Sequence, residues 1–188
     1  MANDLKGRRQ IVARHLPKNA VGIEIGVFKG DFSSSILEVL TPKKLFLIDP
    51  WQNMDDPKFA KSLFGKDSVN DMAQIMSDVA TRFKDEISAG RVVMMQGKSE
   101  ERLAEFKDAS VDFVYIDGDH SYEGVKQDLE LAFPKVKPGG FLALDDYNIE
   151  GWWKDGINRA AHEFLGKHAS VLEIKGYNQG QLILRVKP

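Results

Sequence analysis

The stretch that decides the fold is residues 114–147, "VYIDGDHSYEGVKQDLELAFPKVKPGGFLALDDY". It holds two short apolar runs on either side of a helix-like segment, and each run ends in acidic residues. Apolar runs of this length predict strands covered on both faces, as in a parallel sheet between two layers of helices. The chain between Asp117 and Asp145 is long enough for a helix and a right-handed return to a neighbouring strand. We therefore expect both aspartates at one edge of a parallel sheet.

The same alternation continues along the chain. The predicted parallel strands are the apolar runs at residues 21–28, 44–49, 91–97, 111–117 and 141–146. Helical spacing predicts helices over residues 68–87, 121–133 and about 153–166, the first capped by Ser68 with Asp71 and the second started by Ser121. Residues 138–140 predict a turn before a strand, and residues 171–187 predict two strands joined around Asn178 and Gly180. The sequence thus predicts an α/β fold that ends in a hairpin.

Composition limits the classes of protein. The chain has 188 residues, 43% of them hydrophobic, which is enough for one domain with a substantial core. The formal net charge is −2 and the basic residues are scattered, so we expect no nucleic-acid partner. The absence of cysteine excludes disulfides and thiolate metal sites. No apolar run has the length of a membrane span or the character of a signal peptide, so we expect a soluble, cytoplasmic protein without membrane contact.

Candidate ligand-binding residues follow the strands, because an open parallel sheet binds its ligand beyond the carboxyl ends of the strands. After the first run, Gly22, Glu24, Gly26 and Gly30 form the pattern G-x-E-x-G-x-x-x-G. Glycines let the backbone approach a ligand closely. A dinucleotide fingerprint would have glycine in place of Glu24, whereas an acid suits a ligand with positive charge.

Two more polar residues follow the second and third runs. Asp49 follows the second run and can accept hydrogen bonds from both hydroxyls of a ribose. Ser99 follows the third run. Taken singly, such residues are often only tight turns or helix caps. Their occurrence at successive strand ends favours a ligand site.

These residues resemble the class I S-adenosylmethionine-dependent methyltransferases. The resemblance runs from "VGIEIGVFKG" through "LIDPW", "GKSEE" and residues 111–147 to the terminal hairpin. Within the class the chain is most similar to small-molecule O-methyltransferases of the sugar-methylating kind, and it shares its metal-site spacing with the catechol O-methyltransferases. The resemblance implies one Rossmann-like domain over residues 1–188, with an N-terminal helix at 1–18 and a seven-stranded, mostly parallel sheet in the order 3-2-1-4-5-7-6.

The resemblance also implies roles for particular residues. Its cofactor-binding set is Glu24, Gly26 and Gly30 at the methionine end, Asp49 at the ribose, Ser99 near the adenine, and Asp117. Asp117, Asp145 and Asp146 match the ligands of a magnesium ion. His120 matches the catalytic base. We expect His120 and Asp117 to be the catalytic residues.

Elementary chemistry supports such a metal site. Neighbouring strands lie about 4.8 Å apart, so the three aspartates can meet at one point, where they repel each other unless a cation is present. Oxygen ligands favour magnesium, manganese or calcium over zinc. A metal orients two vicinal hydroxyls and makes one more acidic, and His120 could accept the proton near neutral pH. A solvated loop histidine is the alternative for His120, and Asp119 is better explained as a turn former.

The acceptor side is less specific. Residues 51–88 are more than one helix needs to reach the next strand, so they could form a lid or acceptor wall with Trp51, Phe59 and Phe64. An extra helix with ordinary core contacts is an equal alternative. Trp152 and Trp153 are expected near the mouth of the pocket, where they would suit a sugar or an aryl ring.

The leading hypothesis is a divalent-metal-dependent O-methyltransferase that acts on a small hydroxylated molecule such as a sugar, glycoside or catechol. A non-catalytic S-adenosylmethionine-binding sensor or assembly protein is the alternative, and a nicotinamide dehydrogenase is a weaker third. The combination of His120 with the acidic residues favours the enzyme, because binding of the cofactor alone does not need it. The acceptor, the pathway and the oligomeric state stay open, and a homodimer is compatible.

Overall fold

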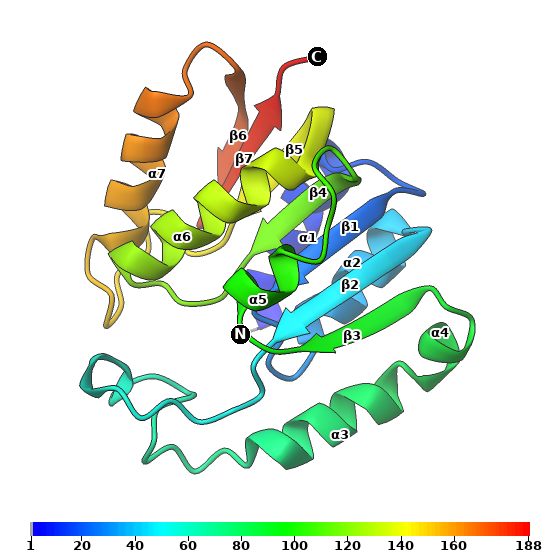
Figure 1. The fold of residues 1–188 in the computed structure, drawn as a ribbon, viewed down its shortest axis with the longest axis vertical. Coiled ribbons are helices and arrows are strands. Elements are labelled where there is room, and N and C mark those ends of the chain that lie inside the picture. The colour runs from blue at the N-terminus through cyan, green and yellow to red at the C-terminus, as the bar shows by residue number, and fades with distance from the viewer. Residues whose placement is uncertain (1) are drawn as a thin grey trace.

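The computed structural model describes residues 2–188, and the side chains of residues 7–188. Its centre is a seven-stranded sheet in the order β3-β2-β1-β4-β5-β7-β6, which confirms the expected order (Figure 1). The strands are β1 Val21–Ile25, β2 Lys44–Asp49, β3 Val92–Gln96, β4 Val111–Ile116, β5 Val136–Leu144, β6 Leu172–Asn178 and β7 Gln181–Val186. Strands β1 to β5 pair in parallel, whereas β7 runs antiparallel to both β5 and β6.

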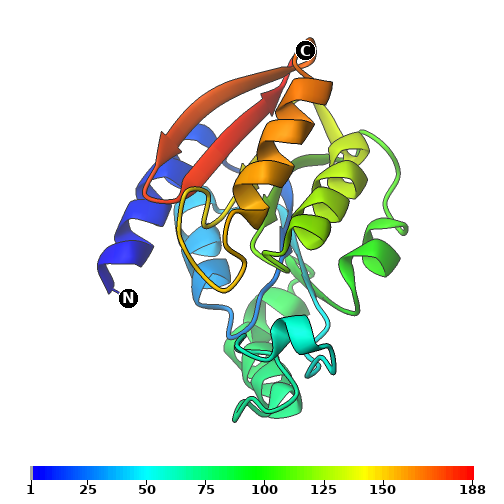
Figure 2. The ribbon, with the colours of Figure 1, turned by 90° about the vertical axis from the view of Figure 1, so that its left-hand side faces the viewer.

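Helices cover both faces of this sheet. They are α1 Ala2–His15, α2 Asp31–Leu40, α3 Met72–Arg82, α4 Lys84–Ser88, α5 Ser99–Leu103, α6 Tyr122–Ala132 and α7 Gly156–Lys167, with short 3-10 turns η1 Pro57–Phe59 and η2 Phe133–Lys135. One core lies under α1, α2 and α3, and the other under α5, α6 and α7. Helix α1 packs against α2 and β6 (Figure 2). Position 1 of the expected N-terminal helix lies outside the described residues.

Strand β4 shows why the apolar runs are continuous. Phe113 and Tyr115 face the core under α1 and α2, whereas Val114 and Ile116 face the core under α6 and α7. Successive side chains of a strand point to opposite faces, so a strand between two helical layers is apolar on both faces. Among the described helices, none combines the length and apolar character that crossing a bilayer requires.

The expected helix over residues 68–87 is shorter and broken in the structure. Helix α3 begins only after Asp71, whose carboxylate accepts a hydrogen bond from the Gln74 amide. Ser68 is not the cap, because its hydroxyl bonds within the preceding loop to the Leu63 carbonyl. Val69, expected on the apolar face, is 100% exposed. The cap for α6 is confirmed, since Ser121 accepts from the Gly124 amide.

The expected turn at residues 138–140 is also a correction, because these residues lie inside β5. Gly139 has a φ of +83°, and the pairing of β4 with β5 shifts register between Val111 and Phe113. A glycine with positive φ and a register shift are features of a β-bulge. The glycines at 139 and 140 therefore lie at an irregularity within β5 and not in a turn before it.

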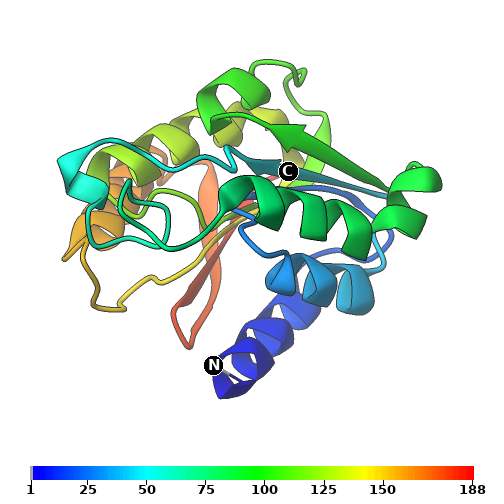
Figure 3. The ribbon, with the colours of Figure 1, turned by 90° about the horizontal axis from the view of Figure 1, so that it is seen from below.

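The carboxyl ends of β1, β2 and β4 point toward the segment 50–71, which contains η1 (Figure 1). Seen from below, α3 lies along one face of the sheet (Figure 3). The segment 50–71, which leads into α3, lies next to the loop before α7. This edge of the sheet therefore has loops from several parts of the chain around it, as binding in an open α/β sheet requires.

Gly22 tests the close packing between β1 and β4. A β-carbon there would lie 2.0 Å from Cζ of the buried Phe113 ring. We expect Gly22→Ala to lower the free energy of unfolding by about 1–3 kcal/mol, measured by urea denaturation. The matched control is Gly166→Ala in α7, where a β-carbon meets nothing within 4 Å and should stabilise by about 0.5–1 kcal/mol. Equal effects of both substitutions would contradict the packing argument.

Candidate active site

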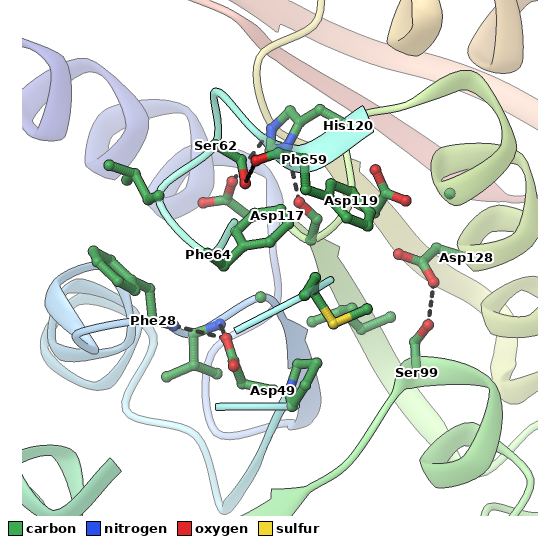
Figure 4. Close-up of a pocket in the computed structure, with 18 of the residues that line it drawn as sticks. Phe28, Asp49, Phe59, Ser62, Phe64, Ser99, Asp117, Asp119, His120 and Asp128 are labelled. Atoms are coloured by element: carbon green, nitrogen blue, oxygen red, sulfur yellow. Dashed lines mark hydrogen bonds and ion pairs between the residues drawn. The ribbon is translucent and has the colours of Figure 1, made fainter. Parts of the chain in front are cut away.

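A cavity of about 810 Å³ lies at the carboxyl ends of the parallel strands (Figure 4). Its lining includes most of the expected site residues, namely Glu24, Gly26, Asp49, Ser99, Asp117, His120, Asp145 and Asp146. Gly30 is not in the lining. It precedes α2 with a φ of +73°, and a β-carbon there would lie 2.9 Å from the Phe83 ring, so the turn itself favours glycine, and the cofactor contact of Gly30 stays a prediction.

The glycine after β1 is required by the neighbouring strand. Gly26 has a φ of +85°, and a β-carbon at this position would lie 2.0 Å from the Asp117 carbonyl oxygen. Only glycine fits such a position without strain. Gly26 therefore lets the loop after β1 approach the turn after β4, at the floor of the cavity.

Glu24 is a buried carboxyl beside the cavity. Its side chain is 1% exposed, and within the described part of the chain its Oε2 has no hydrogen-bond partner. Burial raises the pKa of Glu24 to about 8, and the Asp49 and Asp145 carboxylates add to this rise. A cationic group of a ligand would satisfy the free oxygen and favour the charged form.

Asp49 anchors the loop after β1. Its Oδ2 accepts hydrogen bonds from the amides of Val27 and Phe28, both at 2.9 Å. Figure 4 shows Asp49 beside Phe28. Oδ1 of Asp49 accepts from the Trp51 amide at 2.7 Å. Burial raises the pKa of Asp49, and these bonds oppose the rise. A carboxylate has about four acceptor positions, so the ribose contact stays a prediction.

Ser99 has an unexpected partner on α6. Its hydroxyl donates to Oδ1 of Asp128 at 2.5 Å, and both residues line the cavity. Burial raises the pKa of Asp128 to about 7, and the Ser99 hydrogen bond opposes the rise. Sequence reasoning missed Asp128. The available signal was an acidic residue on the apolar face that Val125 and Leu129 define in α6.

The acidic cluster joins β4 and β5. The Asp145 amide donates to the Ile116 carbonyl at 2.9 Å, which fixes Asp145 beside the end of β4. Within the described chain, one compact group of metal-ligand type has donor atoms all within 4.8 Å of one another, and it comprises Asp117, His120 and Asp145. The expected set had Asp146 instead of His120. Asp146 lies close by, with its Oδ2 3.6 Å from Nε2 of His120.

His120 is held in one orientation. Its Nδ1 lies 2.9 Å from the Gly118 carbonyl oxygen, and its ring lies 4.6 Å from the Trp153 ring, centroid to centroid. A carbonyl only accepts hydrogen bonds, so Nδ1 carries the hydrogen and Nε2 of the neutral ring has a free lone pair. That Nε2 lies 3.5 Å from Oδ1 of Asp117.

Charge repulsion is concentrated at Asp117. Burial and the neighbouring Asp145 carboxylate raise the pKa of Asp117 well above its usual range, while the Arg8 guanidinium opposes this rise. The cluster thus favours either protonation or a bound cation.

Two residues that the sequence analysis missed contact Asp145. The Gln181 amide donates to its Oδ1, and the Tyr115 hydroxyl donates to Oε1 of Gln181 at 2.5 Å. Nη1 of Arg8 lies 2.5 Å from its Oδ2. No local sequence signal indicates Arg8, whereas Gln181 is a polar residue at the start of an apolar strand.

Aromatic residues border the cavity from two segments. Phe59 and Phe64 lie 5.0 Å apart, and Trp152 lies 5.7 Å from Phe59, between ring centroids. Trp152 and Trp153 line the cavity, as expected. Trp51 agrees with the alternative of ordinary core contacts, because it is 3% exposed and its indole donates to the Phe28 carbonyl.

The segment with η1 also contacts the turn after β4. Nζ of Lys58 lies 3.2 Å from Oδ2 of Asp119. The other oxygen of Asp119 accepts from the Ser121 amide at 2.9 Å, which confirms Asp119 as a turn former. The cavity is therefore bordered by the chain between β2 and α3.

Residues 23–147 match a family model described as a methyltransferase domain. The chain belongs to this methyltransferase family. This is the family of class I S-adenosylmethionine-dependent methyltransferases that the motifs led us to expect. The methyltransferase is similar to the 8-demethyl-8-(2,3-dimethoxy-alpha-L-rhamnosyl)-tetracenomycin-C 4'-O-methyltransferase of Streptomyces olivaceus, with 35% identity over 66 residues, 34% of this chain and 23% of that protein. In the two curated relatives that match, the aligned stretches span only 19% and 23% of the protein.

Solved structures share the fold of the methyltransferase. The O-methyltransferase TomG from Streptomyces achromogenes, in complex with S-adenosylmethionine, aligns with a TM-score of 0.65 and 18% identity over 100% of this chain and 80% of that chain. An rRNA methylase from Streptococcus thermophilus aligns with a TM-score of 0.62 and 12% identity over 96% of this chain and 95% of that chain.

The predicted cofactor contact of Glu24 can be tested through pH. Its raised pKa means that the folded protein holds this proton more tightly than the unfolded chain, so Glu24 makes the ligand-free protein less stable as pH rises from about 4.5 to 8. We expect the melting temperature of Glu24→Gln to fall less steeply over this window than that of the wild type, and its affinity for S-adenosylhomocysteine to be lower. If the melting temperatures of both proteins fell equally steeply with pH, and the affinity for S-adenosylhomocysteine were unchanged, the cofactor contact of Glu24 would be contradicted.

Proposed function

We propose that the methyltransferase is a divalent-metal-dependent O-methyltransferase that acts on a hydroxyl of a small molecule. The observation that carries this proposal is the convergence of Asp117, Asp145 and His120 at the cavity that Glu24 also lines. An S-adenosylmethionine-binding site needs an acid such as Glu24, but it does not need a second, separate group of two carboxylates and an imidazole.

The residues present fit a divalent ion. The donor atoms of the compact group lie within 4.8 Å of one another, and two of its three members are carboxylates. Carboxylate oxygens are preferred by magnesium and manganese. A neutral imidazole has one free lone pair, so Nε2 of His120 either binds the ion or accepts a proton. We assign it the proton, and we assign the ion to Asp117, Asp145 and the nearby Asp146.

In the proposed reaction, S-adenosylmethionine supplies an activated methyl group and the ion, when bound, orients the acceptor hydroxyls and makes one more acidic. His120 removes the hydroxyl proton at Nε2, while the Gly118 carbonyl and the Trp153 ring hold its orientation. Glu24 binds the positive end of the cofactor. The aromatic rings of Phe59, Phe64 and Trp152 exclude water and contact the acceptor.

A sugar or another small hydroxylated ring is the acceptor class that we favour. Aromatic faces at the cavity suit such rings. The relative from Streptomyces olivaceus is named for methylation of a rhamnosyl group, which supports a glycoside. The formal charge of −2 with scattered basic residues argues against RNA, although an rRNA methylase shares the fold. In this proposal the segment 51–88 forms part of the acceptor wall.

The test is transfer of labelled methyl from S-adenosylmethionine into a pool of polyols, glycosides and catechols. We expect a chelator to abolish transfer, and His120→Ala to lower kcat about 10²–10⁴-fold with little change in Mn²⁺ affinity. His162→Ala is the matched control, because His162 is exposed on α7 and does not line the cavity.

Two results would change the assignment. Transfer that survives both the chelator and His120→Ala would remove the metal mechanism and leave a methyltransferase of another type. Binding of S-adenosylmethionine without transfer to any member of the pool would favour the non-catalytic sensor.

A further inference from the structure

The acidic cluster contains a cation from the N-terminal helix. Arg8 lies on α1, and its guanidinium contacts all three carboxylates. Nη1 is 2.5 Å from Oδ2 of Asp145 and 3.4 Å from Oδ2 of Asp117, and Nη2 is 3.5 Å from Oδ1 of Asp146. The Arg8 side chain is only 15% exposed. This contact joins the first helix to residues more than a hundred positions away.

Arg8 and a divalent ion cannot occupy this position together. An ion bound to Asp117 and Asp145 lies about 2.1 Å from the carboxylate oxygens. Nη1 of Arg8 already lies against one oxygen of each of these carboxylates. Both cations would therefore need the same space and the same acceptor atoms.

The guanidinium also cannot give up its charge. Arginine stays protonated in proteins, so Arg8 can leave the cluster only by moving. Its helix is anchored through Ile11 and Val12, and by Leu16 directly after the helix, all buried in the core beside α2. A change of side-chain rotamer is therefore the simplest way for Arg8 to leave. In its present position the Arg8 Cζ lies 6.0 Å from the centroid of the Phe32 ring.

We propose that Arg8 is the internal counter-ion of the acidic cluster and that a divalent ion competes with it for the Asp117 and Asp145 oxygens. The proposal rests on the proposed function, because it takes the cluster to be the metal site. Arg8 then sets the affinity of the enzyme for its metal. When the ion is absent, Arg8 offsets part of the negative charge of the carboxylates. The apparent affinity for the ion is then the intrinsic affinity multiplied by the fraction of molecules in which Arg8 has left the cluster.

The experiment measures Mn²⁺ binding by the full-length protein, using calorimetry and the electron paramagnetic resonance signal of free Mn²⁺. We expect Arg8→Gln to bind Mn²⁺ at least about tenfold more tightly than the wild type. Arg9→Gln is the matched control, because Arg9 is on the same helix but pairs with Glu38 through Nη2 at 2.5 Å. It should leave the affinity unchanged.

A second measurement uses the same proteins without metal. Arg8→Gln removes one counter-ion from the carboxylates, so its melting temperature should fall, and Mn²⁺ should raise it by more than it raises that of the wild type. If Arg8→Gln does not fold, Arg8→Lys serves instead. We expect its Mn²⁺ affinity to exceed that of the wild type, because a single ammonium cannot contact the three carboxylates as the guanidinium does.

The proposal is overturned if removal of Arg8 weakens Mn²⁺ binding or leaves it unchanged, or if no variant binds Mn²⁺. Failure of the proposed function has a different signature. Tighter Mn²⁺ binding by Arg8→Gln together with chelator-insensitive methyl transfer would uphold the competition and reject the metal mechanism. Chelator-sensitive transfer, with equal Mn²⁺ affinities of Arg8→Gln and the wild type, would uphold the metal mechanism and reject the competition by Arg8.

Discussion

The carboxylates of Asp117 and Asp145 meet where β4 and β5 end, and their repulsion has to be offset by a cation. The strands fix this meeting, because Ile116 pairs with Leu144 and the next amide, that of Asp145, donates back to the Ile116 carbonyl. The acids are therefore placed by the hydrogen bonds of the sheet and not by a flexible loop. Such a position stores unfavourable charge when empty of cations, which makes it suited to binding one.

The rest of the site is built around that constraint. Buried groups orient Asp145, since Gln181 from β7 holds one oxygen while Arg8 from α1 contacts the other. Strand β1, beside β4, contributes Glu24, whose burial leaves it ready for a cationic ligand. The two acidic features lie in one cavity, and in the proposed function Glu24 binds the positive end of the cofactor whereas the cluster binds a cation.

Much of this arrangement could be predicted from the sequence, but not all. Continuous apolar runs indicated the parallel strands, and the acids at the strand ends indicated the site, because both signals are local. The strand order came from family resemblance. Arg8, Gln181 and Asp128 were missed because their roles depend on contacts across the fold. Val69 was misassigned because apolar character alone does not distinguish a core position from a loop, and for the same reason the sequence left two alternatives open for Trp51, a lid and ordinary core contacts.

Diffraction at the manganese absorption edge, from crystals soaked in Mn²⁺, tests the central claim most directly. We expect an anomalous peak within bonding distance of the Asp117 and Asp145 carboxylates, with the Arg8 guanidinium moved away from both. Density for Arg8 in its present position, with no anomalous peak between the two aspartates, would contradict this account.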